Sequence, residues 1–393
     1  MFDAIVVGAR CAGSPTAMLL ARAGHRVLLV ERGERGTDTL STHVIHQPGV
    51  AALARWGLLD RVRATGCPPL DRVLYRVADI RLEGSGDGVD GQRAGYAPRR
   101  RLLDPVLSDA AAEAGVEVRH RCSVTGLLRE DSGRVCGVRL RQGGREFTER
   151  AHLVIGADGM RSTVAELSGA RETQRTPRLT CAYYAYWEGV PSLLELYERP
   201  GGWVASVPTN DGATLVLAYL PQSRYNEVRT DADAAYTEQI RATAPTLHER
   251  LRDGRRVEQL RGTGHQENFF RQASGPGWAL VGDAGHHKDS ITARGITDAF
   301  LQAESLAGHI AGLLDERPRL DEALDAWARH RDEAMAEGYQ AALSAARLET
   351  HPKRLSLLRA VASEPELTST YFDVFAGVKP PTALYTPRLL ARL

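Results

Sequence analysis

The chain has 393 residues, and its 50 Lys and Arg residues nearly balance its 49 Asp and Glu residues, which leaves a formal net charge of +1. This balance argues against a nucleic acid or an anionic membrane as partner, and the five cysteines show no CxxC pair and no metal-ligand spacing. With no apolar run approaching the ~18 residues of a membrane span and no basic leader, we expect a cytoplasmic protein.

The chain begins with the pattern of a dinucleotide-binding turn. The apolar run 2–7 reads as a buried parallel strand, and a six-residue turn from Gly8 to Gly13 follows it. Gly8 permits a tight turn, and Gly13 permits a helix to pack closely on the strand. Arg10 stands where this motif has its middle glycine, so a pyrophosphate would meet a side chain as well as backbone.

The next segment completes a strand, helix and strand unit. A helical pattern covers 12–23, and a second apolar run over 27–30 ends at Glu31. A helix N-terminus offers unpaired N–H groups to a pyrophosphate, and an acid about twenty residues later can accept ribose hydroxyls. We therefore expect an adenine dinucleotide here. The expected contacts are Gly8, Arg10, Cys11, Ala12, Gly13, Glu31 and Arg32.

Two polar segments that follow are open to two interpretations. Thr42 lies in a loop before a helix predicted over 48–59, and it either caps that helix or edges the cofactor. Arg99 belongs to three consecutive arginines at the start of a helix predicted over 97–114, where cations are electrostatically disfavoured. Either an anion lies close to these arginines, or they form a solvated basic corner.

Two later strand ends carry an aspartate. One buried strand breaks at Asp158-Gly159, and another ends at Gly282-Asp283 before a helix that begins near residue 295. An Asp-Gly pair alone is usually only a turn. A strand-end carboxylate and a helix N-terminus, however, can converge on the same ligand as the opening turn.

Residues 177–261 change to alternating, aromatic-rich segments. This pattern predicts an antiparallel sheet with one helix over 232–251, and we place the substrate domain here. Tyr184, Tyr186 and Trp203 either line a substrate pocket or belong to the core of the sheet. After residue 320 the chain is predicted to be mostly helical and divided by prolines.

Together, the turn at Gly8 with Glu31, the stretch at Asp158 and the stretch at Asp283 resemble the FAD-dependent flavoprotein monooxygenases (group A type) of the para-hydroxybenzoate hydroxylase fold. The resemblance implies an α/β fold, with a Rossmann-like FAD-binding domain, a mixed or antiparallel-sheet substrate domain and C-terminal helices. The implied FAD-binding segments are 1–72, 95–176 and 262–318, with a strand excursion at 73–94, the substrate domain at 177–261 and the helical region at 319–393.

The resemblance also implies roles for single residues. Arg99 would reach the FAD pyrophosphate, Val124 would lie by the adenine, and Asp283 would bind the ribityl chain. The helix N-terminus at 295–297 would face the pyrimidine side of the flavin and stabilise its anionic reduced form. The further contacts implied are Thr42, Asp158, Gly159, Gly282, Gly295, Ile296 and Thr297.

Several residues depart from the family pattern or are open candidates for catalysis. Ser290 stands where the family usually has a proline whose backbone lies close to the reacting oxygen, and Thr297 replaces an asparagine. His286 and Lys288 are candidate bases by their place in the flavin loop, or else they are structural. His286 and His287 are adjacent and point in different directions, with no third ligand at useful spacing, so we expect no metal.

The resemblance implies an FAD-dependent monooxygenase of a small, aromatic or polyketide-like secondary metabolite, with NAD(P)H as donor and O2 as co-substrate. The alternatives are a reductase of a C=C bond, a halogenase, a non-redox isomerase or cyclase, and a flavin-binding regulatory module. A halogenase is disfavoured because the Trp-x-Trp-x-Ile-Pro signature is absent, with residues 186–191 as the segment compared. If no nicotinamide reduces the flavin, the expected partner is a separate flavin reductase.

Overall fold

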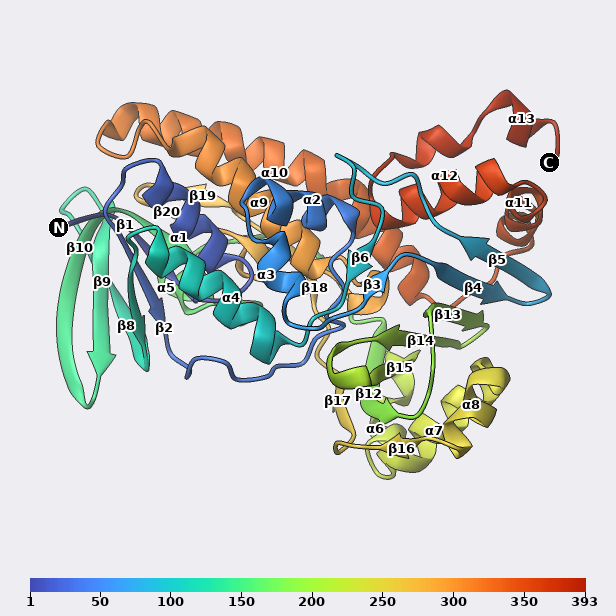
Figure 1. Cartoon of the computed structure of the whole chain (residues 1–393). Helices are drawn as coiled ribbons and strands as arrows, with labels where there is room; N and C mark the ends of the chain where they lie inside the picture. The colour runs from blue at the N-terminus through green and yellow to red at the C-terminus, as the bar shows by residue number, and fades with distance from the viewer.

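A mostly parallel sheet passes through the half of the molecule that contains the N-terminus (Figure 1). Its strands are β1 (Phe2–Val7), β2 (Val27–Glu31), β7 (Glu117–His120), β10 (Arg145–Gly156), β19 (Ser274–Gly275) and β20 (Trp278–Leu280). In the computed structural model, which describes residues 1–393, their order is β19-β20-β10-β1-β2-β7. Only β19 at the edge is antiparallel to its neighbour, so the carboxyl ends of the other strands meet at one side of the sheet.

The two faces of this sheet bury different partners because successive side chains of a strand point in opposite directions. On one face, Val6 and Leu29 share a buried core with Met18 of α1 (Gly13–Arg22) and Phe300 of α9 (Gly295–Ile310). On the other face, Leu28 packs with residues of an antiparallel meander. The meander consists of β8 (Cys122–Arg129), β9 (Val135–Gln142) and the first half of β10.

A second, mainly antiparallel sheet lies beside the first (Figure 1). Its strands are β4 (Val73–Val77), β5 (Ile80–Gly84), β12 (Thr180–Glu188), β13 (Leu194–Arg199), β14 (Gly202–Pro208), β15 (Thr214–Pro221), β16 (Arg255–Arg256) and β17 (Arg261–Thr263). The order is β16-β12-β15-β14-β13-β4-β5, with β17 on β12, and β4 pairs parallel with β13. The predicted α/β class with a mixed or antiparallel second sheet is confirmed.

Two predicted helices are each divided in the structure. The helix predicted over 232–251 is α7 (Ala232–Thr243) and α8 (Pro245–Arg252), because Pro245 has no N–H and Ala244 is not helical. The helix predicted over 48–59 is α2 (Gln47–Arg55) and α3 (Leu59–Arg63), which are separated where Gly57 takes a φ of +74°.

The C-terminal region is helical, and prolines begin most of its helices. The elements are α10 (Arg317–Ala346), α11 (Pro352–Ala362), α12 (Pro365–Ala376), η5 (Pro381–Leu384) and α13 (Pro387–Leu390). Proline is tolerated in a first turn, where its missing N–H would have no partner. A Cβ at Gly377, after α12, would lie 2.1 Å from Nη2 of Arg294, so the end of α12 packs tightly on the residue before α9.

The remaining elements connect these layers. They are β3 (Pro69–Leu70), β6 (Gly95–Tyr96), α4 (Arg100–Glu113), α5 (Thr163–Ser168), β11 (Glu172–Thr176), η1 (Asn210–Gly212), η2 (Gln222–Arg224), α6 (Tyr225–Val228), β18 (Asn268–Arg271), η3 (Gly282–Ala284), β21 (His286–His287) and η4 (Ser290–Thr292). No helix is both long and apolar enough to cross a membrane.

The tight packing of α1 on β1 predicts the effect of Gly13→Ala. A Cβ at Gly13 would lie 1.8 Å from the carbonyl oxygen of Gly8, so we expect the variant to lose roughly 3 kcal/mol or more of unfolding free energy. The measurement is chemical denaturation. The control is Gly308→Ala in α9, where nothing lies within 4 Å and a gain of roughly 0.5–1 kcal/mol is expected. A Gly13→Ala variant as stable as wild type would contradict this packing.

Candidate functional site

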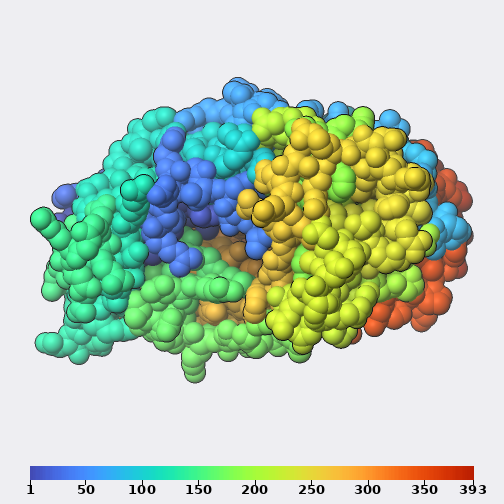
Figure 2. All heavy atoms as spheres, turned by 90° about the horizontal axis from the view of Figure 1, so that it is seen from below, coloured from blue at the N-terminus to red at the C-terminus, as the bar shows by residue number.

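A cavity of about 610 Å³ lies at the carboxyl ends of the central strands. Its lining comes from the turn after β1, the end of β2, the start of α4, the Asp158 turn and the loop from Gly282 into α9. Figure 2 shows this side of the molecule hollowed between the blue N-terminal residues and the residues coloured yellow to orange. Ligands of parallel α/β sheets bind at this edge, so the cavity is the candidate site.

The turn after β1 presents backbone to the cavity. Gly8 has a φ of +103°, a conformation that favours glycine, and Gly13 lies too close to Gly8 for any side chain. The first turn of α1 has neither a capping side chain nor an acidic residue. Within the first turn, the N–H groups of Ser14 and Thr16 donate to the carbonyl oxygens of Arg10 and Ala12. The N–H groups of Cys11 and Ala12, just before the helix, have no protein partner and are available to an anionic ligand.

Glu31 ends β2 at the edge of the cavity. Its carboxylate accepts hydrogen bonds from the N–H of Ala9 at 3.0 Å and the N–H of Gly33 at 2.7 Å. The residue is 8% exposed and lines the cavity. A carboxylate has about four acceptor sites, so these two bonds leave lone pairs for ribose hydroxyls.

Arg10 extends along the same edge. Its Nη2 donates to Thr37 Oγ1 at 3.3 Å, and its Nη1 lies 3.9 Å from a carboxylate oxygen of Asp104. The side chain is 33% exposed and lines the cavity. A positive charge therefore lies beside the N-terminus of α1.

Of the three arginines at the start of α4, Arg100 lines the cavity and Arg99 does not. Arg99 is the extended N-cap residue, with a ψ of 139°, and its guanidinium pairs with Asp38 and Glu258. Arg100 is the first helical residue, is buried, and pairs with Asp104 at 2.8 Å. Of these arginines, it is therefore Arg100 that the structure places at the cavity, while the guanidinium of Arg99 is held away from it by two carboxylates.

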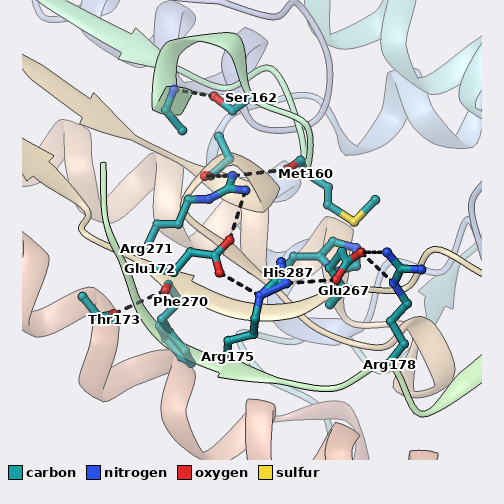
Figure 3. Close-up of polar contacts among 12 residues, drawn as sticks. Met160, Ser162, Glu172, Thr173, Arg175, Arg178, Glu267, Phe270, Arg271 and His287 are labelled. Carbon is teal, nitrogen blue, oxygen red and sulfur yellow. Dashed lines mark hydrogen bonds and ion pairs between the residues drawn. The ribbon is translucent and has the colours of Figure 1, made fainter. Parts of the chain in front are cut away.

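Arg271, at the end of β18, joins the two aspartate-bearing turns (Figure 3). Its Nη1 donates to the carbonyl oxygens of Met160 at 3.2 Å and Ala284 at 3.0 Å. Burial lowers the pKa of Arg271. Glu172, 3.6 Å away, opposes that effect. Arg271 was not found from the sequence, because only the pairing of β18 with β11 and β21 brings it to these turns.

Asp158 lines the cavity, but its carboxylate stabilises α5. It accepts hydrogen bonds from Ser162 Oγ at 2.5 Å and from the N–H groups of Thr163 and Val164 at 2.7 and 3.2 Å. Burial raises the pKa of this carboxyl, and these hydrogen bonds oppose the increase. The Asp158 turn therefore shapes the cavity wall mainly through its backbone.

The loop that enters α9 forms the inner wall. The N–H of Gly282 donates to Gln302 Oε1 at 3.0 Å, and Lys288 forms a buried ion pair with Asp298 in the first turn of α9. Lys288 is therefore held by a carboxylate rather than free to act as a base. The N-cap of α9, Arg294, makes no side-chain capping bond, which leaves N–H groups of the helix start facing the cavity.

His286 and Ser290, the residues expected to be catalytic, both line the cavity. His286 is buried with its ring 4.4 Å from that of Phe270, and burial and the charges of Lys288 and Arg331 hold its pKa well below the usual value. The imidazole is therefore neutral. Ser290 has hydrogen-bond partners on both sides, Tyr219 and Gln266.

Most of the residues expected to contact the cofactor converge on this cavity. Those that line it are Gly8, Arg10, Cys11, Ala12, Glu31, Arg32, Thr42, Val124, Asp158, Gly159, Gly282, Asp283, Gly295 and Ile296. Thr297 does not line it, because its hydroxyl accepts the N–H of His46 at 2.9 Å inside the protein. Gly13 lies behind the turn. No cluster of His, Cys, Asp and Glu is arranged to hold a metal ion.

The aromatic residues expected in a substrate pocket are core residues of the second sheet. Tyr186 donates or accepts a hydrogen bond with His43 at 2.6 Å and lies under the guanidinium of Arg99. Tyr184 packs edge-on against Tyr186, and Trp203 packs on Tyr75. None of Tyr184, Tyr186 and Trp203 lines the main cavity, since these contacts fill the space around their rings.

The cavity fits FAD in size and chemistry. Its volume is within the range of cofactor sites, roughly 300–1,000 Å³. Three lining residues, His286, Arg294 and Gln302, each have a buried nitrogen without a protein partner. Two helix N-termini and Arg10 supply positive potential for phosphates and for an anionic flavin ring.

A family model described as "FAD binding domain" matches residues 1–341. The chain belongs to this family. As a flavoprotein of the para-hydroxybenzoate hydroxylase fold, it is an FAD-dependent oxidoreductase. The digeranylgeranylglycerophospholipid reductase of Methanosarcina mazei is 30% identical over 323 residues, which cover 79% of this chain and 75% of that protein.

Two solved structures show the same fold. The myxobacterial chondrochloren halogenase CndH aligns with a TM-score of 0.80 and 23% identity, covering 100% of this chain and 95% of that chain. PqsL of Pseudomonas aeruginosa, described as a probable FAD-dependent monooxygenase, aligns with a TM-score of 0.72 and 20% identity, covering 95% and 99%. These alignments support the fold of the flavoprotein and leave its reaction open.

The position of Arg10 predicts weaker FAD binding in Arg10→Ala. Loss of a charged contact with the pyrophosphate is expected to raise the FAD dissociation constant about 10-fold. The measurement is a fluorescence titration of the apoprotein with FAD. Arg241→Ala, on the exposed face of α7, is the matched control. Unchanged FAD affinity in Arg10→Ala would show that this side chain does not reach the phosphates.

Asp289 predicts a pH dependence of stability. Burial raises the pKa of its carboxyl to about 6 from 3.8 in spite of hydrogen bonds from Thr180 and Ile291. A carboxyl with a raised native pKa stabilises the fold fully below pH 3.8 and loses that contribution as the pH rises through about 6.

We therefore expect wild type to lose roughly 3 kcal/mol relative to Asp289→Asn between pH 4 and pH 8, at 1.36 kcal/mol per pKa unit. Denaturation curves at several pH values measure this difference. Asp131→Asn, in an exposed hairpin, should show none of it. Parallel pH profiles of wild type and Asp289→Asn would contradict the buried carboxyl assignment.

Proposed function

We propose that the protein is an FAD-dependent monooxygenase of a small, largely apolar organic compound, with NAD(P)H as electron donor and O2 as co-substrate. A second cavity supports this proposal. It is lined mainly by apolar side chains of β13, β14 and β15, with Ile291 and with Phe375 of α12. Thr42 and Ala293 line both cavities, so the two cavities adjoin each other. They meet near the N-terminus of α9, which Ala293 precedes.

The chain's own residues suit oxygen chemistry at this junction. Bound FAD would supply the transfer of electrons from the donor and of oxygen to the substrate. The apolar walls from Leu196, Leu217 and Phe375 would exclude water, which otherwise diverts reactive oxygen species. The N-terminus of α9 would stabilise negative charge on the reduced ring.

The size of the second cavity favours a small substrate. Its volume is about 20 Å³, enough for about one water molecule, and Phe375 closes one side. A long isoprenoid chain would require a far larger channel. A compact substrate would extend from this cavity into the larger one that adjoins it at Thr42 and Ala293.

A C=C bond reductase is the second candidate, because the curated relatives that are 29–30% identical carry that activity in their names. The same cavity would then hold the double bond beside the flavin. Oxygen dependence distinguishes the two reactions.

A halogenase is not favoured, although solved halogenases share the fold. The segment that matches the spacing of the Trp-x-Trp-x-Ile-Pro signature better than 186–191 lies in β14. In β14, Trp203 and Pro208 keep that spacing, with Val207 before the proline. Ala205 replaces the second tryptophan, so the signature is incomplete.

The test of the proposed function compares turnover with and without O2. For the purified FAD-loaded protein, small aromatic compounds should accelerate NAD(P)H oxidation in air, and one atom of ¹⁸O from ¹⁸O2 should enter the product. A product with two added hydrogens, formed equally without O2, would overturn monooxygenation and support the reductase. If dithionite but not NAD(P)H bleaches the flavin, a partner reductase should restore the oxygenation.

A further inference from the structure

A pair of hydroxyl groups connects the two cavities. Tyr219 of β15 lines the second cavity, which we call the apolar cavity, and Ser290 of η4 lines the cavity of about 610 Å³, which we call the FAD cavity. The Tyr219 hydroxyl lies 3.0 Å from Ser290 Oγ. Tyr219 is only 1% exposed, so this hydrogen bond is shielded from bulk solvent.

The direction of this bond follows from the groups behind Ser290. The N–H of Ser290, which can only donate, lies 3.2 Å from Gln266 Oε1 and thereby identifies that atom as the amide oxygen. The Ser290 hydroxyl also donates to Gln266 Oε1. Its single proton is therefore used, and Ser290 can only accept from Tyr219.

Two further hydrogen bonds, through Thr180 to Asp289, keep the Gln266 amide in this orientation. Its Nε2 donates to Thr180 Oγ1 at 2.8 Å, and Thr180 Oγ1 donates to Asp289 Oδ2 at 2.7 Å. All four side-chain bonds thus run in one direction, from Tyr219 to the Asp289 carboxylate. The direction in which the Tyr219 hydroxyl donates is therefore determined by the Asp289 carboxylate at the other end of this series of hydrogen bonds.

As a result, the Tyr219 oxygen has only lone pairs left for a ligand. His46, another polar residue of the apolar cavity, has the same polarity: its Nε2 lies 3.2 Å from the carbonyl oxygen of Thr292 and must carry the hydrogen. Burial lowers the pKa of His46 to about 4, so the ring is neutral and its Nδ1 is an acceptor. Apart from these two acceptors, Thr42 is the one polar residue in the lining of this cavity.

We infer that Tyr219 selects compounds with a hydroxyl or N–H donor on a small apolar body, and that Ser290 is the positioning residue that makes Tyr219 an acceptor. This inference rests on the proposed function, in that the reacting compound occupies the apolar cavity. An ether of the same shape leaves the Tyr219 oxygen without a partner, which costs affinity.

The test uses phenol and anisole, which differ by the methylation of one hydroxyl. Their dissociation constants are measured from changes in the flavin absorbance of the FAD-loaded protein, without O2 or donor. For wild type we expect phenol to bind at least about 5-fold more tightly than anisole. In Tyr219→Phe this ratio should fall toward 1, because the hydrogen bond from phenol to Tyr219 is lost and His46 remains as the other acceptor.

Ser290→Ala tests the positioning role separately. Without Ser290 as acceptor, the Tyr219 O–H is free to donate to the anisole oxygen, so the ratio should fall through tighter anisole binding. Tyr183→Phe removes a hydroxyl from the opposite face of the same sheet and should keep the wild-type ratio. If Tyr219→Phe does not fold with FAD bound, the Ser290→Ala ratio decides.

Equal affinity for phenol and anisole in wild type would overturn the inference, as would no flavin response to phenol. If Tyr219→Phe prefers phenol over anisole as strongly as wild type does, Tyr219 is not the residue that selects the hydroxyl donor. Because binding requires neither O2 nor turnover, a protein that prefers phenol but never oxygenates would contradict only the proposed function.

Discussion

The contact between Gly13 of α1 and the carbonyl oxygen of Gly8 controls the rest of the site. It allows the helix to start directly over the end of β1, so its N–H groups face the cavity. The same helix packs against α4 and α9. The position of α1 therefore also determines where Arg100 and the second helix N-terminus lie. A side chain at either glycine would displace all three from the cavity.

The sequence predicted the elements whose signals are local. The strand over 2–7 and the unit that ends at Glu31 appear within a residue or two of their predicted bounds, and the predicted antiparallel sheet appears within 177–261. Apolar periodicity and glycine position are sufficient there, because each element buries one continuous face. Most of the expected FAD contacts belong to such segments, so they converge on the cavity.

The errors concern features that depend on tertiary structure. Arg99 pairs with Asp38 and Glu258, which are distant in the sequence, so only the tertiary structure shows that Arg100 and not Arg99 lines the cavity. Tyr219 and Tyr184 belong to similar aromatic strands, and only the packing of the sheet decides which ring meets a cavity. Arg271 reaches the two aspartate-bearing turns only because β18 pairs with β11 and β21, which are distant from it in the sequence or follow it after a loop. The serine at position 290, which departs from the family's proline, adds an N–H and a hydroxyl that proline lacks, and both form hydrogen bonds with Gln266.

The lining of the FAD cavity extends from Val7 to Gln302, so three quarters of the chain must be in place before the site exists. Such long-range contacts slow folding, because the chain must close large loops before it gains their energy. During synthesis, an early N-terminal βαβ unit would present its glycine turn without the opposite wall. The cofactor can then be captured only late, and its binding stabilises the nearly completed protein rather than guiding its first steps.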